Sequence, residues 1–218
     1  MYKQYKKNQE GFTLIELLIA ISVFTIGIMA AFTLALSNIN TVRDNFNRVL
    51  SANLSREGLE VVRNIRDTNW LKIQDNEDCS GNVGLQICEW ANGLGVGYYY
   101  ADHDDTELTA FSCNDTIDNC MSLCIDVSGS CNLYLNGGTY NHDQLGTKSS
   151  MSRIIKIENI CITEVDGLPV EDTRDNGPCD KSIGEVHAGI RVTSKVRWTG
   201  TNKSIDIDAS ELMYDWRR

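Results

Sequence analysis

Gly11-Phe12-Thr13-Leu14-Ile15-Glu16-Leu17-Leu18 begins the stretch of sequence that decides the fold. Its apolar run continues from Phe12 to Leu36, about 25 residues, which is long enough for one helix to span a bilayer. Glu16 is the only charged side chain between Phe12 and Val42. A carboxylate inside such a segment costs roughly 2.5–3.5 kcal/mol on insertion scales, so it normally has a partner. The sequence therefore predicts a membrane helix in which Glu16 has a specific function.

Two common explanations of such an N-terminus remain as alternatives. A secretory signal peptide has a basic start, an apolar core of about 7–15 residues and a small-residue cleavage site. The basic start is present as Lys3, Lys6 and Lys7. Ala35-Leu36-Ser37 is a passable cleavage site, but the apolar run is longer than a signal peptide needs. A plain signal anchor fits the length of the run and gives no reason for Glu16.

The same residues resemble the class III leader of type IV prepilins and type II secretion pseudopilins, whose pattern is matched residue for residue from Gly11 to Leu18. The resemblance covers about the first 40 of the 218 residues and is highly specific. It implies that prepilin peptidase cuts between Gly11 and Phe12, and that Phe12 is then N-methylated. It also implies that Glu16 pairs with the free amine of a neighbouring subunit during filament assembly.

The chemistry of this cut supports the implied role of Glu16. Cleavage after Gly11 creates a positive amine within one helical turn of the Glu16 carboxylate, and opposite charges attract far more strongly in a low dielectric than in water. A pair formed between adjacent helices would offset the burial cost of both charges and fix their axial register. Small residues that would let such helices approach closely are Gly27, Ala30, Ala31 and Ala35. The three leader lysines predict a cytoplasmic leader and an exported remainder.

The apolar helix contains no proline, since the only two prolines are Pro169 and Pro178. Many major pilins carry a proline in the later part of this helix, where it loosens the helix in the filament. This departure from the family pattern favours a minor component over a major pilin.

The net charge is strongly acidic. It is −10 for the full chain, and it becomes about −12 without the leader, because three lysines and Glu10 leave together. An acidic chain is a poor candidate for electrostatic binding of nucleic acid, so no direct nucleic-acid binding is expected.

All eight cysteines lie after residue 78, in the part of the chain expected to be exported. An even number confined there predicts disulfides formed in an oxidising compartment, with a connectivity that the sequence leaves open. Clustering suggests local bridges among Cys79, Cys88, Cys113, Cys120, Cys124 and Cys131, with Cys161 and Cys179 as a separate pair. Zinc is the alternative use, through the spacing of Cys120 and Cys124. No Cys-x-x-Cys pair occurs, however, and the histidines lie far from the cluster.

Apolar residues continue at helical spacing past the membrane segment, as at Val42, Phe46 and Leu50. They predict that an amphipathic helix continues to about Asn69, with Gly58 as a soft point. The next part, rich in Asp, Asn, Gly, Ser and Cys, predicts loops with short strands. Alternating patterns then predict strands at Arg153–Val165, His187–Trp198 and Ser204–Leu212, with a hairpin turn at Thr199-Gly200-Thr201-Asn202.

A long helix followed by these strands predicts an α+β fold, in which the N-terminal helix packs on a C-terminal antiparallel β-sheet head. The resemblance implies the same pilin-like arrangement. The expected parts are a cleaved leader (1–11), a transmembrane and filament-core helix (12–40), an amphipathic helix (41–70), a loop-rich, disulfide-stapled insertion (71–150) and the β-sheet (151–218).

No combination of residues predicts a catalytic site, and no cofactor is expected. The acidic loop with Asp102, Asp104 and Asp105 is a weak calcium candidate, because it lacks the ligand spacing and the turn glycine of an EF-hand. A solvated loop is the favoured interpretation. His187 alternates with the apolar face of its strand and is expected to face solvent.

The resemblance implies a structural subunit and not an enzyme: a minor pilin or pseudopilin of a type IV pilus or type II secretion pseudopilus. The implied partners are prepilin peptidase, other pilin or pseudopilin subunits, the membrane and an inner-membrane assembly platform. The expected location is the cytoplasmic membrane, with the head exported, and then a cell-surface or periplasmic filament. The alternatives are a surface adhesin delivered on a pilin stalk, which residues 71–150 motivate, and a membrane-anchored exported enzyme.

Overall fold

The computed structural model describes residues 11, 13–74, 90–165, 168–175, 177–200 and 203–215. Several residues of the sequence predictions lie outside this described part: Phe12, Cys79, Cys88, the leader lysines, and Thr201 and Asn202 of the predicted hairpin turn. The chain divides into two compact units, one that ends at Phe46 and one that begins at Asn47.

The first unit contains the beginning of α1 (Leu14–Gln74). Thr13 caps this helix, because its hydroxyl accepts from the Glu16 N–H at 3.4 Å and its carbonyl accepts from the Leu17 N–H at 3.2 Å. Every residue from Thr13 to Arg43 is exposed. The helix is long and apolar enough to cross a membrane, and a helix that is apolar on all sides is normally buried in lipid or protein. The first unit therefore has the character of a membrane anchor.

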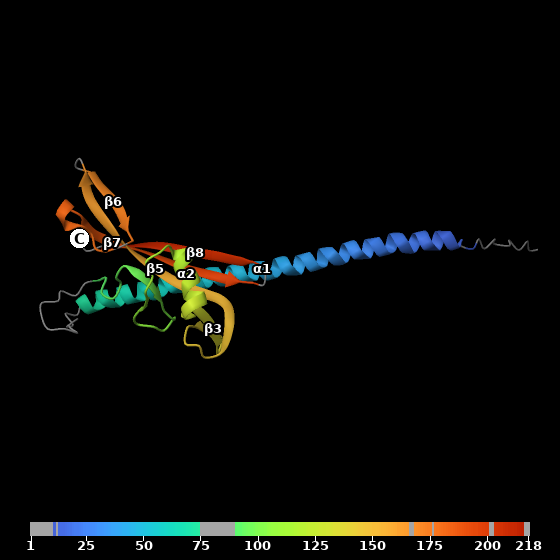
Figure 1. Ribbon diagram of the computed structural model, residues 1–218, viewed down its shortest axis with the longest axis horizontal. Coiled ribbons are helices and arrows are strands. Elements are labelled where there is room, and N and C mark those ends of the chain that lie inside the picture. The colour runs from blue at the N-terminus through green and yellow to red at the C-terminus, as the bar shows by residue number, and fades with distance from the viewer. Residues whose placement is uncertain are drawn as a thin grey trace, which may run out of the picture. The chain divides into compact units, whose positions relative to one another are not determined.

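The second unit contains the rest of α1, a short helix and an antiparallel sheet (Figure 1). Its strands are β1 (Gly97–Tyr100), β2 (Thr109–Phe111), β3 (Asn132–Asn136), β4 (Thr139–Asn141), β5 (Thr147–Val165), β6 (Leu168–Arg174), β7 (Val186–Thr199) and β8 (Ser204–Tyr214). The short helix is α2 (Ile117–Leu123), which continues into a π-helical turn (Cys124–Ser128); a 3-10 turn follows at Lys181–Ile183. The predicted α+β fold is confirmed, and each of the three predicted strands is present with a few more residues.

The long strand β5 holds the sheet together. On one side it pairs with β7, and β8 pairs with the outer side of β7. On its other side β5 pairs in turn with β3, β1 and β6, and all these pairs are antiparallel. Residues from both 71–150 and 151–218 therefore share one sheet.

The part of α1 after Asn47 covers one face of this sheet (Figure 1). The buried cluster between them contains Leu59, Val61, Val62 and Ile65 from α1 and Ile155, Ile157, Ile190, Val192 and Met213 from the strands. The strand residues follow the alternation expected of a strand with one side packed. Full burial of each such side chain contributes about 1.5–3 kcal/mol, so this face is the main core of the head.

Gly58 lies where α1 packs closely against the sheet. A Cβ added there would lie 2.4 Å from Ser194 Oγ and 3.3 Å from Arg153 Cδ. One turn earlier, the Ser55 hydroxyl donates to the Ser194 carbonyl at 2.6 Å. The prediction of a soft point at Gly58 is wrong, because the glycine permits a tight contact between helix and sheet and α1 continues unbroken to Gln74.

The opposite face of the sheet is covered at one end by α2. Met121 of α2 is fully buried in a second cluster with Tyr98 of β1 and Ile154 of β5. Ile154 lies between residues that face α1, so its side chain points to the other side of the same strand. The sequence predicted only loops and short strands in this region. The structure adds a helix of seven residues, which is too short for its periodicity to be recognised.

A β-bulge near the start of β7 changes which side chains face α1. The register skips Ala188, so that Cys161 pairs with His187. The extra residue shifts the alternation, and the half-buried His187 ring stacks on Trp90 with the ring centroids 5.9 Å apart. The prediction that His187 faces solvent is wrong, because it assumed an unbroken alternation along the strand.

Candidate functional site

Glu16 is the only acidic side chain in the exposed segment Thr13–Arg43, and it lies in the first turn of α1. Its backbone N–H is used by the Thr13 cap, but within the described residues its carboxylate has no hydrogen bond or ion pair. Gly11, before the predicted cut, is exposed. Phe12 lies outside the described residues. The chain therefore leaves the Glu16 carboxylate accessible to a group from another molecule.

The hydroxyl groups of the same segment are satisfied by the helix itself. Ser22, Thr25, Thr33 and Thr41 each donate to a carbonyl three or four residues earlier, at 2.8–3.0 Å. Such bonds let hydroxyls enter lipid without an external partner. Among the described residues from Leu14 to Leu36, Glu16 is thus the polar side chain that still lacks a partner.

The described part of the head contains three disulfides, Cys113–Cys120, Cys124–Cys131 and Cys161–Cys179. Every cysteine in the described part of the chain is bonded in this way, and the predicted presence of disulfides is confirmed. Cys79 and Cys88 lie outside the described residues. The zinc alternative fails for Cys120 and Cys124, because each sulfur is already joined to another cysteine.

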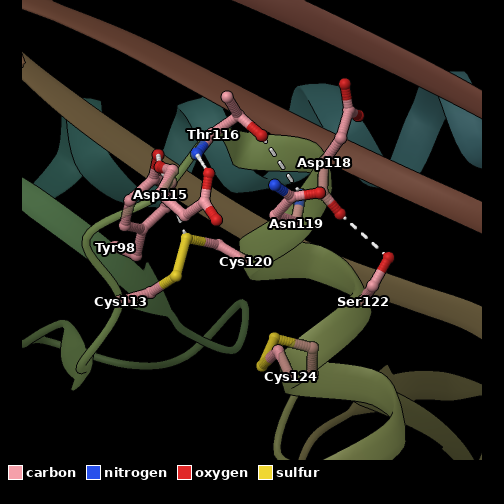
Figure 2. The surroundings of a disulfide bond; sticks show 10 residues. Tyr98, Cys113, Asp115, Thr116, Asp118, Asn119, Cys120, Ser122 and Cys124 are labelled. Carbon is pink, nitrogen blue, oxygen red and sulfur yellow. Dashed lines mark hydrogen bonds between the residues drawn. A yellow bond between two sulfur atoms is a disulfide. The ribbon is translucent and has the colours of Figure 1, made fainter.

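Two of these disulfides fasten α2 to the head (Figure 2). Cys120 lies within α2 and Cys124 directly after it, and both are fully buried. The Thr116 hydroxyl caps the helix by accepting from the Asn119 N–H at 3.4 Å. The Tyr98 hydroxyl donates to a carbonyl just before the cap at 2.6 Å. Because a helix of seven residues is not stable alone, these links determine its position.

Asp102, the first residue of the weak calcium candidate, is already engaged by the protein. Its carboxylate accepts from His142 Nδ1 at 2.6 Å and from the His142 N–H at 3.0 Å, and it lies 3.9 Å from the Arg153 guanidinium. Burial by itself raises the pKa of Asp102, but the hydrogen bonds from His142 and the positive charge of Arg153 outweigh it, so the pKa is lowered. Asp105 accepts from the Asp102 N–H at 2.7 Å, and Asp104 is exposed. Asp102 thus joins its loop to His142, and Asp105 stabilises the turn within the loop.

One set of three possible metal ligands has its donor atoms within 4.8 Å of one another in the described part of the chain: Cys161, Cys179 and Glu185. The two cysteines form a disulfide, so neither provides a thiolate. The Glu185 carboxylate binds Arg174 and accepts from the Asp180 N–H at 2.6 Å. This set therefore does not have the chemistry of a metal site.

Arg153 is a central residue of the head that the sequence analysis did not single out. Its side chain is fully buried. It donates to the Leu54 carbonyl at 3.1 Å, to Glu57 Oε1 at 2.8 Å and to the Ala101 carbonyl at 2.6 Å. One side chain therefore joins α1, β5 and the loop after β1. Its position in the strand indicates the burial: Arg153 is four residues before Ile157, so the two side chains lie on the same face of the strand, and that face packs on α1.

Comparison with known proteins gives one result. A family profile described as the prokaryotic N-terminal methylation motif matches residues 6–32. No curated protein and no solved structure matches the chain. The matched residues contain the predicted cleavage site, Glu16 and most of the apolar run from Phe12 to Leu36. Residues 6–32 therefore carry the signature of type IV pilins and pseudopilins, as the resemblance of Gly11–Leu18 indicated, and support a pilin-like substrate of prepilin peptidase.

Proposed function

We propose that this protein is a minor pilin or pseudopilin, a structural subunit that enters a type IV pilus or a type II secretion pseudopilus through its N-terminal helix. One observation carries the proposal: within the methylation motif, Glu16 is the only acidic side chain of the helical segment Leu14–Arg43, whose residues are all exposed, and its carboxylate has no partner among the described residues. Such a surface needs a cover from outside the chain, and such a carboxylate needs a cation.

The assembly step follows from the position of Glu16. Prepilin peptidase cuts between Gly11 and Phe12, and Phe12 becomes the methylated N-terminus. The amine that this cut creates belongs to the residue four positions before Glu16 in the sequence. When a neighbouring subunit supplies the amine, the pair neutralises both charges in low dielectric and sets the axial offset between the two helices.

The remaining parts of the proposal concern topology and partners. The leader lies in the cytoplasm, the helix enters the membrane, and the head is exported, where its disulfides form. Other pilin-like subunits, the peptidase and an assembly platform in the inner membrane are the partners. The head is a structural part and not an enzyme, since its buried charged groups are used internally, as in the pairs Asp102–His142 and Arg153–Glu57.

Mass spectrometry of the mature N-terminus tests the first step, and we expect a chain that begins with methylated Phe12. The second step is tested by Glu16→Ala, which should be cleaved normally and fail to enter filaments. Glu60→Ala is the matched control, because Glu60 is an exposed carboxylate on the same helix within the head. An uncut chain that begins at Met1, or normal incorporation of Glu16→Ala, would contradict the proposal.

A further inference from the structure

β8 forms one edge of the sheet and runs for 11 residues without interruption. Each residue from Ser204 to Tyr214 has a partner on β7, with no bulge and no proline in β8. Within the described residues, no strand pairs with the outer side of β8. An edge of this kind presents a row of unpaired N–H and C=O groups to which another strand can add.

Two hydrogen bonds show which residues of β8 direct their main-chain N–H and C=O groups toward the open edge of the sheet. Beyond one end of the ladder the Gly200 N–H donates to the Lys203 carbonyl at 2.8 Å, and beyond the other the Asp215 N–H donates to the Ala188 carbonyl at 3.0 Å. Residues of an antiparallel strand alternate between bonding to the partner strand and pointing away from it. Odd-numbered residues of β8 therefore bond to β7. Those whose N–H and C=O point to the open side include Asp206, Asp208, Ser210 and Leu212.

The side chains of these outward-bonding residues lie on the α2 side of the sheet. Lys195 shows this, because its ammonium forms ion pairs with both Asp118 of α2 and Asp206 of β8. Beside α2, an open groove crosses the sheet and is lined in part by Ile117, Thr193, Asp208, Ser210, Glu211 and Leu212. Glu211 belongs to the other face of β8, so the groove reaches the edge itself. A strand added to β8 would direct alternate side chains into this groove.

The charges along β8 determine which kind of strand fits. Asp206 is paired with Arg197 at 2.7 Å, and Glu211 is paired with Arg63 at 2.5 Å. Asp208 is exposed and has no ion pair among the described residues. In a pair of two β8 strands, the registers that bring Asp206 or Asp208 opposite another aspartate are disfavoured, because like charges opposite each other destabilise a strand pair. A basic side chain beside Asp208 would instead gain an ion pair.

We propose that the edge of β8 is a strand-addition site for an extended basic segment of another protein. The segment bonds to the outward N–H and C=O groups of Asp208, Ser210 and their even-numbered neighbours. It places a lysine or arginine beside Asp208 and an apolar side chain beside Leu212, which is 45% exposed. This inference rests on the head alone and does not depend on the role of Glu16.

The test uses the full-length chain in detergent micelles and a fluorescent peptide, acetyl-Val-Thr-Thr-Thr-Lys-Thr-Thr-Thr-Val-amide, in which each valine is four residues from the lysine, as Leu212 is from Asp208. The matched peptide has glutamate in place of lysine. Ser210→Pro removes one outward N–H without loss of a main-chain bond to β7, which an edge strand tolerates, although it also removes the side-chain hydrogen bond between Ser210 and Thr193. Asp208→Asn removes the charge and keeps the N–H. The control is Asp172→Asn, an exposed carboxylate on β6, another edge of the sheet.

We expect the lysine peptide to bind more tightly than the glutamate peptide in fluorescence anisotropy. Ser210→Pro should weaken binding by about tenfold or more, because the added strand is held mainly by main-chain bonds. Asp208→Asn should weaken it about threefold, as expected for one exposed ion pair, and Asp172→Asn should leave it unchanged. Hydrogen exchange should show protection by the peptide at even-numbered residues of β8, a readout that also serves if Ser210→Pro does not fold.

Three outcomes would overturn the proposal. One is equal affinity for the two peptides, and another is no binding of the lysine peptide up to about 1 mM, the limit of a weak interaction. The third is protection by the peptide at sites away from β8.

Discussion

The two halves of α1 show how one helix can serve two environments. Before Phe46 its large apolar side chains are exposed, whereas after Asn47 residues such as Val62 are fully buried against the sheet. Its two glycines show the same contrast: a Cβ on Gly27 would meet nothing within 4 Å, and a Cβ on Gly58 would lie 2.4 Å from Ser194 Oγ. The apolar surface of the first half must be covered by other molecules, while the head covers its own. Substitutions in the two halves should therefore have different effects.

The largest contrast is expected between Arg153→Ala and Arg43→Ala. Loss of the buried Arg153 leaves the Glu57 carboxylate and two carbonyls without their donor, so the free energy of unfolding of the head should fall by about 3–5 kcal/mol. Arg43 is exposed in the first half, and its loss should change that free energy by less than about 0.5 kcal/mol. Urea unfolding followed by tryptophan fluorescence measures both. Similar changes in the two variants would contradict the assigned role of Arg153.

Disulfide removal comes next in size, and it acts on the head alone, because all cysteines follow residue 78. The Cys161–Cys179 bridge closes a separation of 18 residues, and Cys113–Cys120 one of 7. Replacing both cysteines of a bridge by serine should cost about 3 kcal/mol for the longer loop and about 2 kcal/mol for the shorter one. Circular dichroism should show no loss of α1 helix in either variant. A larger loss for the shorter loop would mean that packing, and not chain entropy, determines the contribution of each bridge.

The substitutions Gly58→Val and Gly27→Val test most directly the contrast between the buried and the exposed half of α1. Gly58→Val would force a side chain into Ser194 and Arg153, so unfolding of the head should become easier by about 1–3 kcal/mol. Gly27→Val has no neighbour in the chain to displace, so the stability of the head should not change. If small residues let helices of neighbouring subunits approach, Gly27→Val should instead reduce the yield of filaments. An unchanged filament yield would mean that Gly27 does not lie between packed helices.

Sequence patterns predicted the long-range features of this chain better than its local deviations. The apolar run with Glu16 predicted the exposed segment, and alternation predicted β5, β7 and β8, because both signals extend over many residues. The bulge at Ala188 depends on a single extra residue, and His187 was placed wrongly for that reason. The buried position of Arg153 depends on contacts with segments about 50 and 100 residues away in sequence. The role of Gly58 was predicted wrongly, because glycine is favoured both where a helix must approach a neighbour closely and where a helix is flexible.

The smallest predicted effect concerns acid and the Asp102–His142 pair in the head. The pKa of Asp102 is lowered from its ordinary value of 3.8, so its charged form stabilises the folded head above about pH 4, and this contribution is lost as the pH falls through the lowered pKa. Asp102→Asn should therefore cost about 1 kcal/mol at pH 7, and the difference from the unmodified chain should shrink below pH 4. Asp104→Asn, at an exposed position in the same loop, is the control and should change little at either pH. Urea midpoints at pH 7 and pH 3 measure the two differences. A cost that stays constant down to pH 3 would show that Asp102 acts through the shape of its hydrogen bonds and not through its charge. In that case Asp102 would act through hydrogen bonding alone, as the uncharged hydroxyls of Ser22 and Thr33 do in the first half of α1.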